Sequence, residues 1–258
     1  MGILVWDTAP SKIFVWWSEV ASVWAGDTKV RPVTPPYLCF TANSYSTIKL
    51  VRYGSAWSVT LETSRDLNTW TTYTLNQTIS LNAGDKIYRR NTSETGMWFS
   101  RSDSYYYQFF MTWSIAASWD IWYLINKNST SWLHVSYPRT FYNLFNSCSS
   151  LTSCPEIKFT SINASCFQNM FVYCTGLTTL PKLYATAIYS DSYKLMFYGC
   201  SKIKLSTAQT WEYQTPYRIP VSWTWSWIGA SDMFTSTWWT RAWTPTINTT
   251  YYTSNTVV

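Results

Sequence analysis

Cysteine is the residue type with the most potential for covalent or metal chemistry in this sequence, and its spacing is regular. Three of the six cysteines, Cys148, Cys174 and Cys200, lie 26 residues apart, and none of the six forms a CxxC pair. Three in-line thiols do not provide the tetrahedron that zinc requires, and a zinc ribbon needs paired CxxC motifs. Equivalent positions of stacked units lie about 4.8 Å apart, the spacing of neighbouring strands. The spacing therefore predicts a ladder of small buried apolar side chains, without a metal ion or a cofactor.

The other catalytic residue types do not combine into a recognisable site. The sequence has one histidine, His134, and no motif surrounds it, so any Ser-His-Asp or Cys-His arrangement would depend on this residue. No GxGxxG, GxxxxGK[ST], GxSxG or HExxH motif occurs, and the carboxylates are few and isolated. We therefore expect a structural or surface role for His134, and we predict that the chain is not an enzyme.

Charge and hydropathy narrow the class of partner. The 258 residues include 19 Lys and Arg and 13 Asp and Glu, and the basic residues are scattered apart from pairs such as Arg89–Arg90. Nucleic-acid binding is not expected without a basic run or stripe. Membrane insertion is not expected either, because every apolar run is shorter than the roughly 18 residues of a transmembrane helix. Met1–Asp7 lacks the basic and long apolar regions of a signal peptide. We expect a protein that reaches its site without such a signal, as virion proteins do, or one whose true N-terminus is missing.

The elements that must position these residues begin with β-strands. Residues 37 to about 115 alternate apolar and polar side chains in short runs separated by turn signals, which is typical of a small antiparallel sandwich. A ten-residue repeat upstream predicts a hairpin turn at Gly26–Asp27, followed by a proline-rich linker. The strands are expected at residues 58–63, 69–74, 78–81, 86–89 and 105–111.

A 26-residue repeat follows the β region. Leu144–Thr152 recurs as Met170–Thr178 and again as Met196–Lys204, and Met233–Phe234 is expected to begin a fourth, irregular unit. A fixed period of this length predicts the stacked units of a solenoid. Each unit is expected to contain a helical turn or two, a tight turn and a short strand, for example Cys166–Phe171 followed by Leu177–Leu180. The ladder that should form the continuous core comprises Phe145, Phe171, Phe197, Cys148, Cys174, Cys200, Leu151, Leu177, Ile203, Pro155 and Pro181.

The repeat pattern [LM]-F-x-x-C-x-x-[LI]-[TK], with a proline a few residues on, resembles the BspA-like leucine-rich repeat surface proteins over about residues 140–205. Similar proteins occur among bacterial surface adhesins and in phage and prophage tail genes. The stretch from Leu38–Ala42 to Tyr107–Phe109 resembles the β domain that often precedes such repeats, and Thr244–Thr253 resembles their usual C-terminal end. The resemblance implies adhesion or receptor binding through the repeat face, without enzymatic activity.

Together these patterns predict an α+β multidomain protein, in which an antiparallel β-sandwich-like domain precedes a short leucine-rich repeat solenoid. The expected parts are an N-terminal β-hairpin segment with a linker (1–35), the sandwich-like domain (36–118), the solenoid with its N-terminal cap (119–205) and an irregular repeat with a C-terminal cap (206–258).

The predicted function is that of a non-catalytic adhesion or recognition protein, which presents a leucine-rich repeat face. We expect it to be extracellular, at a cell surface or on a virion, and to bind a host or bacterial surface protein or a glycan. Two alternatives are a phage tail or fibre component that binds a receptor and a carbohydrate-binding accessory module.

Tryptophan is unusually frequent, with 18 residues against 8 glycines. Several tryptophans occupy positions suited to a turn residue, which leads to the hypothesis that many are UGA codons that the source organism reads as glycine. Trp113 and Trp119 stand where the resembling family usually has glycine, and Ser222–Trp227 would be an ordinary flexible linker with glycine in place of tryptophan. Trp70 is expected to be genuine. The alternatives are a Trp-rich sugar-binding surface and compositional drift.

The codons test this hypothesis directly. We expect the gene to contain UGA at Trp223, Trp225 and Trp227, and peptide mass spectrometry of the natural protein to find glycine there. UGG codons at all three positions would refute the hypothesis.

Overall fold

The computed structural model describes residues 37–55, 59–92, 99–100, 102–126, 134–135, 137–219, 229–237 and 244–258, and the backbone of three two-residue strands outside them. The chain divides into two compact units, Met1–Pro36 and Tyr37–Val258. In the first unit, β1 (Trp24–Ala25) pairs antiparallel with β2 (Thr28–Lys29), and Ala25 lies opposite Thr28. This antiparallel pairing agrees with the predicted hairpin, and the expected turn at Gly26–Asp27 lies outside the described residues.

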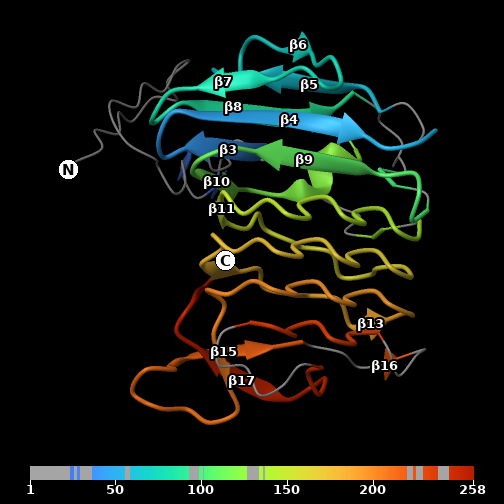
Figure 1. The fold of residues 1–258 in the computed structure, drawn as a ribbon, viewed down its shortest axis with the longest axis vertical. Helices are drawn as coiled ribbons and strands as arrows, with labels where there is room; N and C mark the ends of the chain where they lie inside the picture. Colours follow the sequence, from blue (N-terminus) through green and yellow to red (C-terminus); the bar gives the residue numbers. More distant parts are fainter. Residues whose placement is uncertain are drawn as a thin grey trace. The chain divides into compact units, whose positions relative to one another are not determined.

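Two sheets of the second unit face each other across an apolar core (Figure 1). All their neighbouring strands are antiparallel except β10 and β11, which pair in parallel. The larger sheet has the order β11 (Leu151–Ser153), β10 (Ile115–Ser118), β3 (Leu38–Ala42), β8 (Lys86–Asn91), β5 (Leu61–Ser64) and β6 (Thr71–Thr72). The smaller sheet has the order β7 (Ile79–Leu81), β4 (Ser46–Arg52) and β9 (Tyr107–Met111).

The alternating burial of successive side chains along the strands explains the position of the core. Successive side chains of a strand point to opposite faces, and on β4 the residues Ser46, Ile48 and Leu50 are buried while their neighbours are partly exposed. The rings of Phe40 on β3 and Phe109 on β9 meet edge to face at 5.0 Å, which joins the two sheets. Strands were therefore correctly predicted where the structure has β5 to β9, with ends that differ by a few residues.

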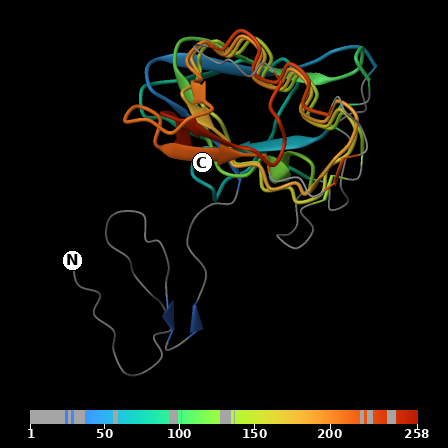
Figure 2. The ribbon, with the colours of Figure 1, turned by 90° about the horizontal axis from the view of Figure 1, so that it is seen from below.

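Residues 137–219 and 229–237 form stacked coils (Figures 1 and 2). The backbone N–H of Phe145 donates to the carbonyl of Met170 on the next coil, at 2.9 Å, and Phe171 makes the equivalent bond to Met196. Within a coil, four-residue turns follow one another, and every fourth residue has a positive φ, for example 58° at Asn169 and 54° at Tyr173. Viewed along the stack, successive coils nearly superimpose (Figure 2).

The prediction of an α+β fold with helix-and-strand repeats is wrong. The described residues contain no α-helix, and the single helical segment among them is a 3-10 helix, η1 (Ile121–Leu124), capped by the side chain of Asp120. The helical turns expected at Cys166–Phe171 do not form, because the N–H of Asn169 donates to the carbonyl of Lys194 on the next coil. Coil-to-coil bonds thus satisfy backbone groups that a helix would pair internally. The fold consists of small sheets and hydrogen-bonded turns.

Short strands link the coils to the sheets and to the C-terminus. β11 belongs to the first repeat and pairs with β10, so the larger sheet continues directly into the stack. The C-terminal segment returns along the stack, since β17 pairs antiparallel with both β14 and β15, and β18 pairs in parallel with β12. The remaining strands are β12 (Thr179–Leu180), β13 (Ala187–Ile188), β14 (Leu205–Ser206), β15 (Thr215–Arg218), β16 (Trp223–Thr224), β17 (Thr250–Thr253) and β18 (Thr256–Val257).

The tryptophans within the described residues fall into contrasting environments. Trp113 and Trp119 both have a φ of 67°, a left-handed conformation that a bulky residue adopts at a cost, and the side chain of Trp113 is 74% exposed. In contrast, the Trp70 ring packs edge to face on Tyr37 at 4.9 Å and lies 3.9 Å from the guanidinium of Arg90. A left-handed backbone at positions 113 and 119 is what the glycine hypothesis requires there. Most other tryptophans lie outside the described residues.

We predict that Trp113→Gly and Trp119→Gly each stabilise the chain by about 1 kcal/mol, because glycine adopts a positive φ without steric cost. Urea denaturation of the full chain measures this change. Trp70→Gly is the matched control, and it should destabilise the protein through loss of its ring contacts. A loss of stability at positions 113 and 119 comparable to that of the control would show that these two side chains contribute native contacts.

Candidate ligand-binding site

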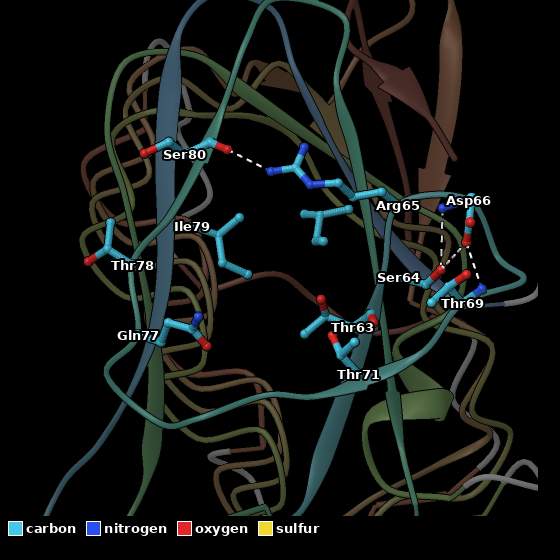
Figure 3. A pocket seen from close by; sticks show the side chains of 11 residues that line it. Thr63, Ser64, Arg65, Asp66, Thr69, Thr71, Gln77, Thr78, Ile79 and Ser80 are labelled. Atoms are coloured by element: carbon cyan, nitrogen blue, oxygen red, sulfur yellow. Dashed lines mark hydrogen bonds between the residues drawn. The ribbon is translucent and has the colours of Figure 1, made fainter.

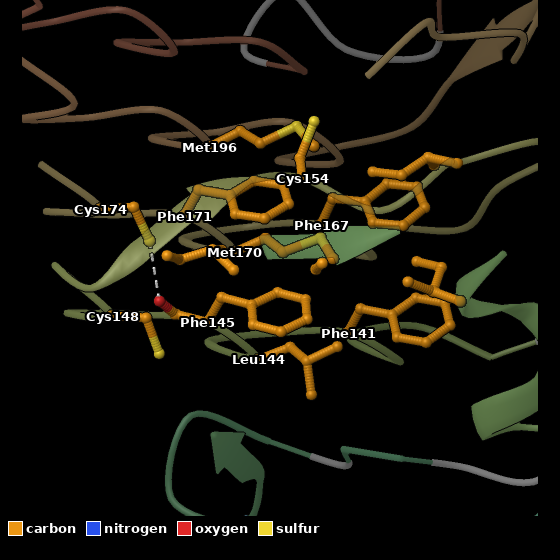
Figure 4. Packing of buried hydrophobic residues seen from close by; sticks show 14 of the residues in the cluster. Phe141, Leu144, Phe145, Cys148, Cys154, Phe167, Met170, Phe171, Cys174 and Met196 are labelled. Carbon is orange, nitrogen blue, oxygen red and sulfur yellow. Dashed lines mark hydrogen bonds between the residues drawn. The ribbon is translucent and has the colours of Figure 1, made fainter. Parts of the chain in front are cut away.

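The residues predicted to form the repeat ladder lie in the core and do not face a ligand. The rings of Phe145 and Phe171 stack at a centroid distance of 5.4 Å with an interplanar angle of 1° (Figure 4). Phe171 and Phe197 stack in the same way, at 5.4 Å and 3°. This column begins in the sheets at Phe109, 5.3 Å from Phe145, and ends at Phe234, 5.4 Å from Phe197. Phe234 thus continues the stack into a fourth unit. The other ladder residues are also buried: Cys148, Cys174, Cys200, Leu151, Leu177, Ile203, Pro155 and Pro181.

The ladder thiols have a specific structural role. The Sγ of Cys174 donates to the carbonyl of Phe145 at 3.0 Å (Figure 4). Cys148 donates in the same way to the carbonyl of Phe109, and Cys200 to the carbonyl of Phe171. Burial raises the pKa of each of these thiols above its ordinary value. Because the thiolate is the reactive and metal-binding form, these groups are inert in the folded protein.

We predict that no cysteine of the native chain reacts with iodoacetamide at neutral pH over minutes, and that all six react once the chain is unfolded. All six are free and buried, so alkylation must wait for local opening. Mass spectrometry of the alkylated chain counts the modified residues. Rapid modification of Cys174 in the native state would contradict the arrangement of the stack.

The remaining sequence candidates do not assemble into a catalytic or metal site. The Nδ1 atom of His134 lies 2.7 Å from the hydroxyl of Ser161, in an exposed position between two coils. Within the described ranges, no group of three or more His, Cys, Asp or Glu side chains is placed to hold a metal ion. A search of the same residues for helices long and apolar enough to cross a membrane also finds none.

A cleft of about 710 Å³ lies between the edges of the two sheets (Figure 3), and most of the residues that line it have polar side chains. Its walls come from β5 and β6 of the larger sheet, from β7 of the smaller sheet and from the loops that connect them. Ile79 and Ile87 contribute apolar surface, and the amide of Gln77 adds a donor and an acceptor. Hydroxyl groups dominate the rest of the lining: Thr63, Ser64, Thr69, Thr71, Thr78 and Ser80.

One arginine spans the cleft. The guanidinium of Arg65 donates from Nη2 to the carbonyl of Ser80 at 2.8 Å and pairs through Nη1 with the carboxylate of Asp85 at 3.2 Å (Figure 3). This contact ties the end of β5 to β7 and to the turn before β8. The opening between the sheets is therefore held at a fixed width on this side.

The carboxylate in the cleft wall, Asp66, has a structural role. Asp66 accepts hydrogen bonds from the backbone N–H groups of Thr69 at 2.7 Å and Asn68 at 2.9 Å, and from the hydroxyl of Ser64 at 3.0 Å. These bonds, the one from Thr69 above all, lower the pKa of Asp66 to about 2. A carboxylate with this pKa is a poor general acid or base near neutral pH. The cleft thus offers many hydrogen-bonding groups, and the described lining lacks an acid–base pair.

No protein-family model matches the chain, and no curated protein or solved structure is significantly similar to it. The function must therefore be argued from the site itself. The sequence analysis missed this site, because its walls come from strands that become neighbours only when the two sheets pack together. The only local signal was the density of threonine and serine between residues 60 and 80.

Proposed function

We propose that the chain is a non-catalytic surface-recognition protein, which binds a hydroxyl-rich ligand such as a glycan in the cleft between β5, β6 and β7. The observation that carries this proposal is the chemistry of the cleft lining. Hydroxyl and amide side chains both donate and accept hydrogen bonds, and so do the hydroxyl groups of a saccharide. The volume of about 710 Å³ is within the usual range for small-molecule sites.

The lining favours binding over turnover. Its carboxylate, Asp66, is already engaged by three donors, and its arginine, Arg65, is paired with Asp85 and Ser80. A glycoside hydrolase would require two free carboxyl groups across the cleft, one of them with a raised pKa. The resemblance of the repeats to bacterial and phage-borne surface proteins supports an extracellular, cell-surface or virion setting.

The rigidity of the surrounding structure also supports recognition. The larger sheet that forms one wall is continuous with the coil stack through the pairing of β10 and β11. A site held by such elements is pre-organised, so less conformational entropy is lost when a ligand binds.

A glycan array probed with the labelled full chain tests the proposal. We expect binding to a subset of oligosaccharides. We also expect Thr71→Val with Thr78→Val to weaken the affinity about thirtyfold, because each change removes a hydroxyl worth about 1 kcal/mol. Thr72→Val is the matched control, since Thr72 follows Thr71 on β6 and does not line the cleft. Titration calorimetry measures the affinities.

Two outcomes would contradict the proposal. The first is an array without signal, or equal binding by the cleft variant and the control. The second is cleavage of the bound saccharide, which mass spectrometry of the ligand detects.

The double variant Trp113→Gly with Trp211→Gly separates the cleft from a surface tryptophan platform, because both side chains are largely exposed. We expect this variant to bind normally.

A further inference from the structure

Arg89 on β8 is a buried cation without an acidic partner among the described residues. Its side chain is fully buried, and its Nε, Nη1 and Nη2 atoms have no acceptor. The guanidinium stacks 3.9 Å from the centre of the Tyr73 ring, which is its one strong contact. Desolvation lowers the pKa of Arg89 to about 10, so the group still carries its charge at neutral pH.

Arg89 is a neighbour of residues that line the cleft, although it does not line the cleft itself. Thr63 on β5 is the pairing partner of Arg89, and Ile87 precedes it by two residues on the same face of β8. Both Thr63 and Ile87 line the cleft. On the far side, the hydroxyl of Tyr73 donates to the carbonyl of Gln77, another lining residue, at 2.7 Å. Arg89 is therefore linked to the cleft through its strand neighbours Thr63 and Ile87 and through its ring partner Tyr73.

A buried guanidinium of this kind costs stability. Removing a charge from water is unfavourable unless a counter-charge or hydrogen bonds compensate, and an apolar residue of similar volume is often at least as stable. The neighbouring Arg90 shows the usual solution, since its Nε donates to Glu62 at 2.7 Å and its guanidinium stacks on Trp70. Arg89 has no such acidic partner among the described residues, and this missing counter-charge points to a group that arrives from outside.

We propose that Arg89 is the inner anchor of the cleft and binds the carboxylate or sulfate group of an acidic saccharide. The inference rests on the proposed function and specifies its ligand class. Arginine presents two parallel N–H donors that match the oxygens of a carboxylate or sulfate, and such bonds are strongest away from water. The hydroxyls of the cleft would hold the rest of the sugar. Because Arg89 does not itself line the cleft, the Thr63 side chain must turn aside, or the guanidinium must move outward, on binding.

The test compares acidic and neutral saccharides on the full chain. Titration calorimetry uses an oligogalacturonate, a sulfated galactan oligosaccharide and a neutral galactan oligosaccharide of equal length. We expect at least one acidic ligand to bind at least tenfold more tightly than the neutral one, and the two acidic arms show whether the carboxylate or the sulfate is recognised. Arg89→Met should abolish this preference. Arg90→Met is the matched control and should retain the preference.

The outcomes separate this inference from the proposed function. Equal affinity for acidic and neutral saccharides, or an Arg89→Met variant that keeps the preference, overturns the inference while binding itself supports the function. Absence of binding by all three saccharides overturns both. A second measurement needs no variant: glucuronate should raise the Tm of the wild-type chain more than glucose at the same concentration, because a ligand stabilises the state that binds it. Equal shifts would also overturn the inference.

Discussion

Hydrogen bonding between consecutive coils is the constraint on which the second unit depends. The N–H of one coil donates to the carbonyl 25 residues later, as in Phe145 to Met170 and Phe171 to Met196, so the chain must return to the same place with a period of 26. Equivalent side chains then lie one above another, and the phenylalanine rings stack at 5.4 Å. The same geometry brings each ladder thiol to a carbonyl of the preceding layer. Backbone pairing, ring stacking and thiol bonding therefore all reinforce one spacing.

The two sheets join this arrangement as an additional layer. Phe109 of β9 occupies the place that a preceding coil would provide, since its ring stacks on Phe145 and its carbonyl accepts the thiol of Cys148. β10 pairs with β11 in the same direction as neighbouring coils. The apolar column thus anchors the sheets at one edge, and the polar cleft lies at the other edge, near β6 and β7. The stacked column and the proposed binding cleft therefore lie in different parts of one unit.

The sequence predicted those features that follow from local pattern and from period. Alternating residues identified the strands near β5 to β9, and the spacing of Cys148, Cys174 and Cys200 identified residues that share one buried column. The helical turns were wrongly predicted, because an apolar run such as Cys166–Phe171 is compatible with a helix when the coil-to-coil bond from Asn169 is unknown. The cleft could not be predicted for a different reason. Thr63, Thr71 and Thr78 are ordinary solvent-facing strand residues until the packing of two sheets sets them across a gap, and an arginine such as Arg89 is expected to be exposed.

The column of stacked rings has a consequence for how such a protein could change over time. Neighbouring coils contact each other through stacked rings, as in Phe141 with Phe167 and Phe145 with Phe171. Duplication or deletion of one whole coil would preserve the contacts between coils, because the new neighbours would meet through the same rings and carbonyls. The distance between the cleft and the C-terminal cap could therefore lengthen or shorten in steps of one coil, without alteration of the residues around the cleft. The length of the coil stack and the residues of the cleft would then change independently of each other.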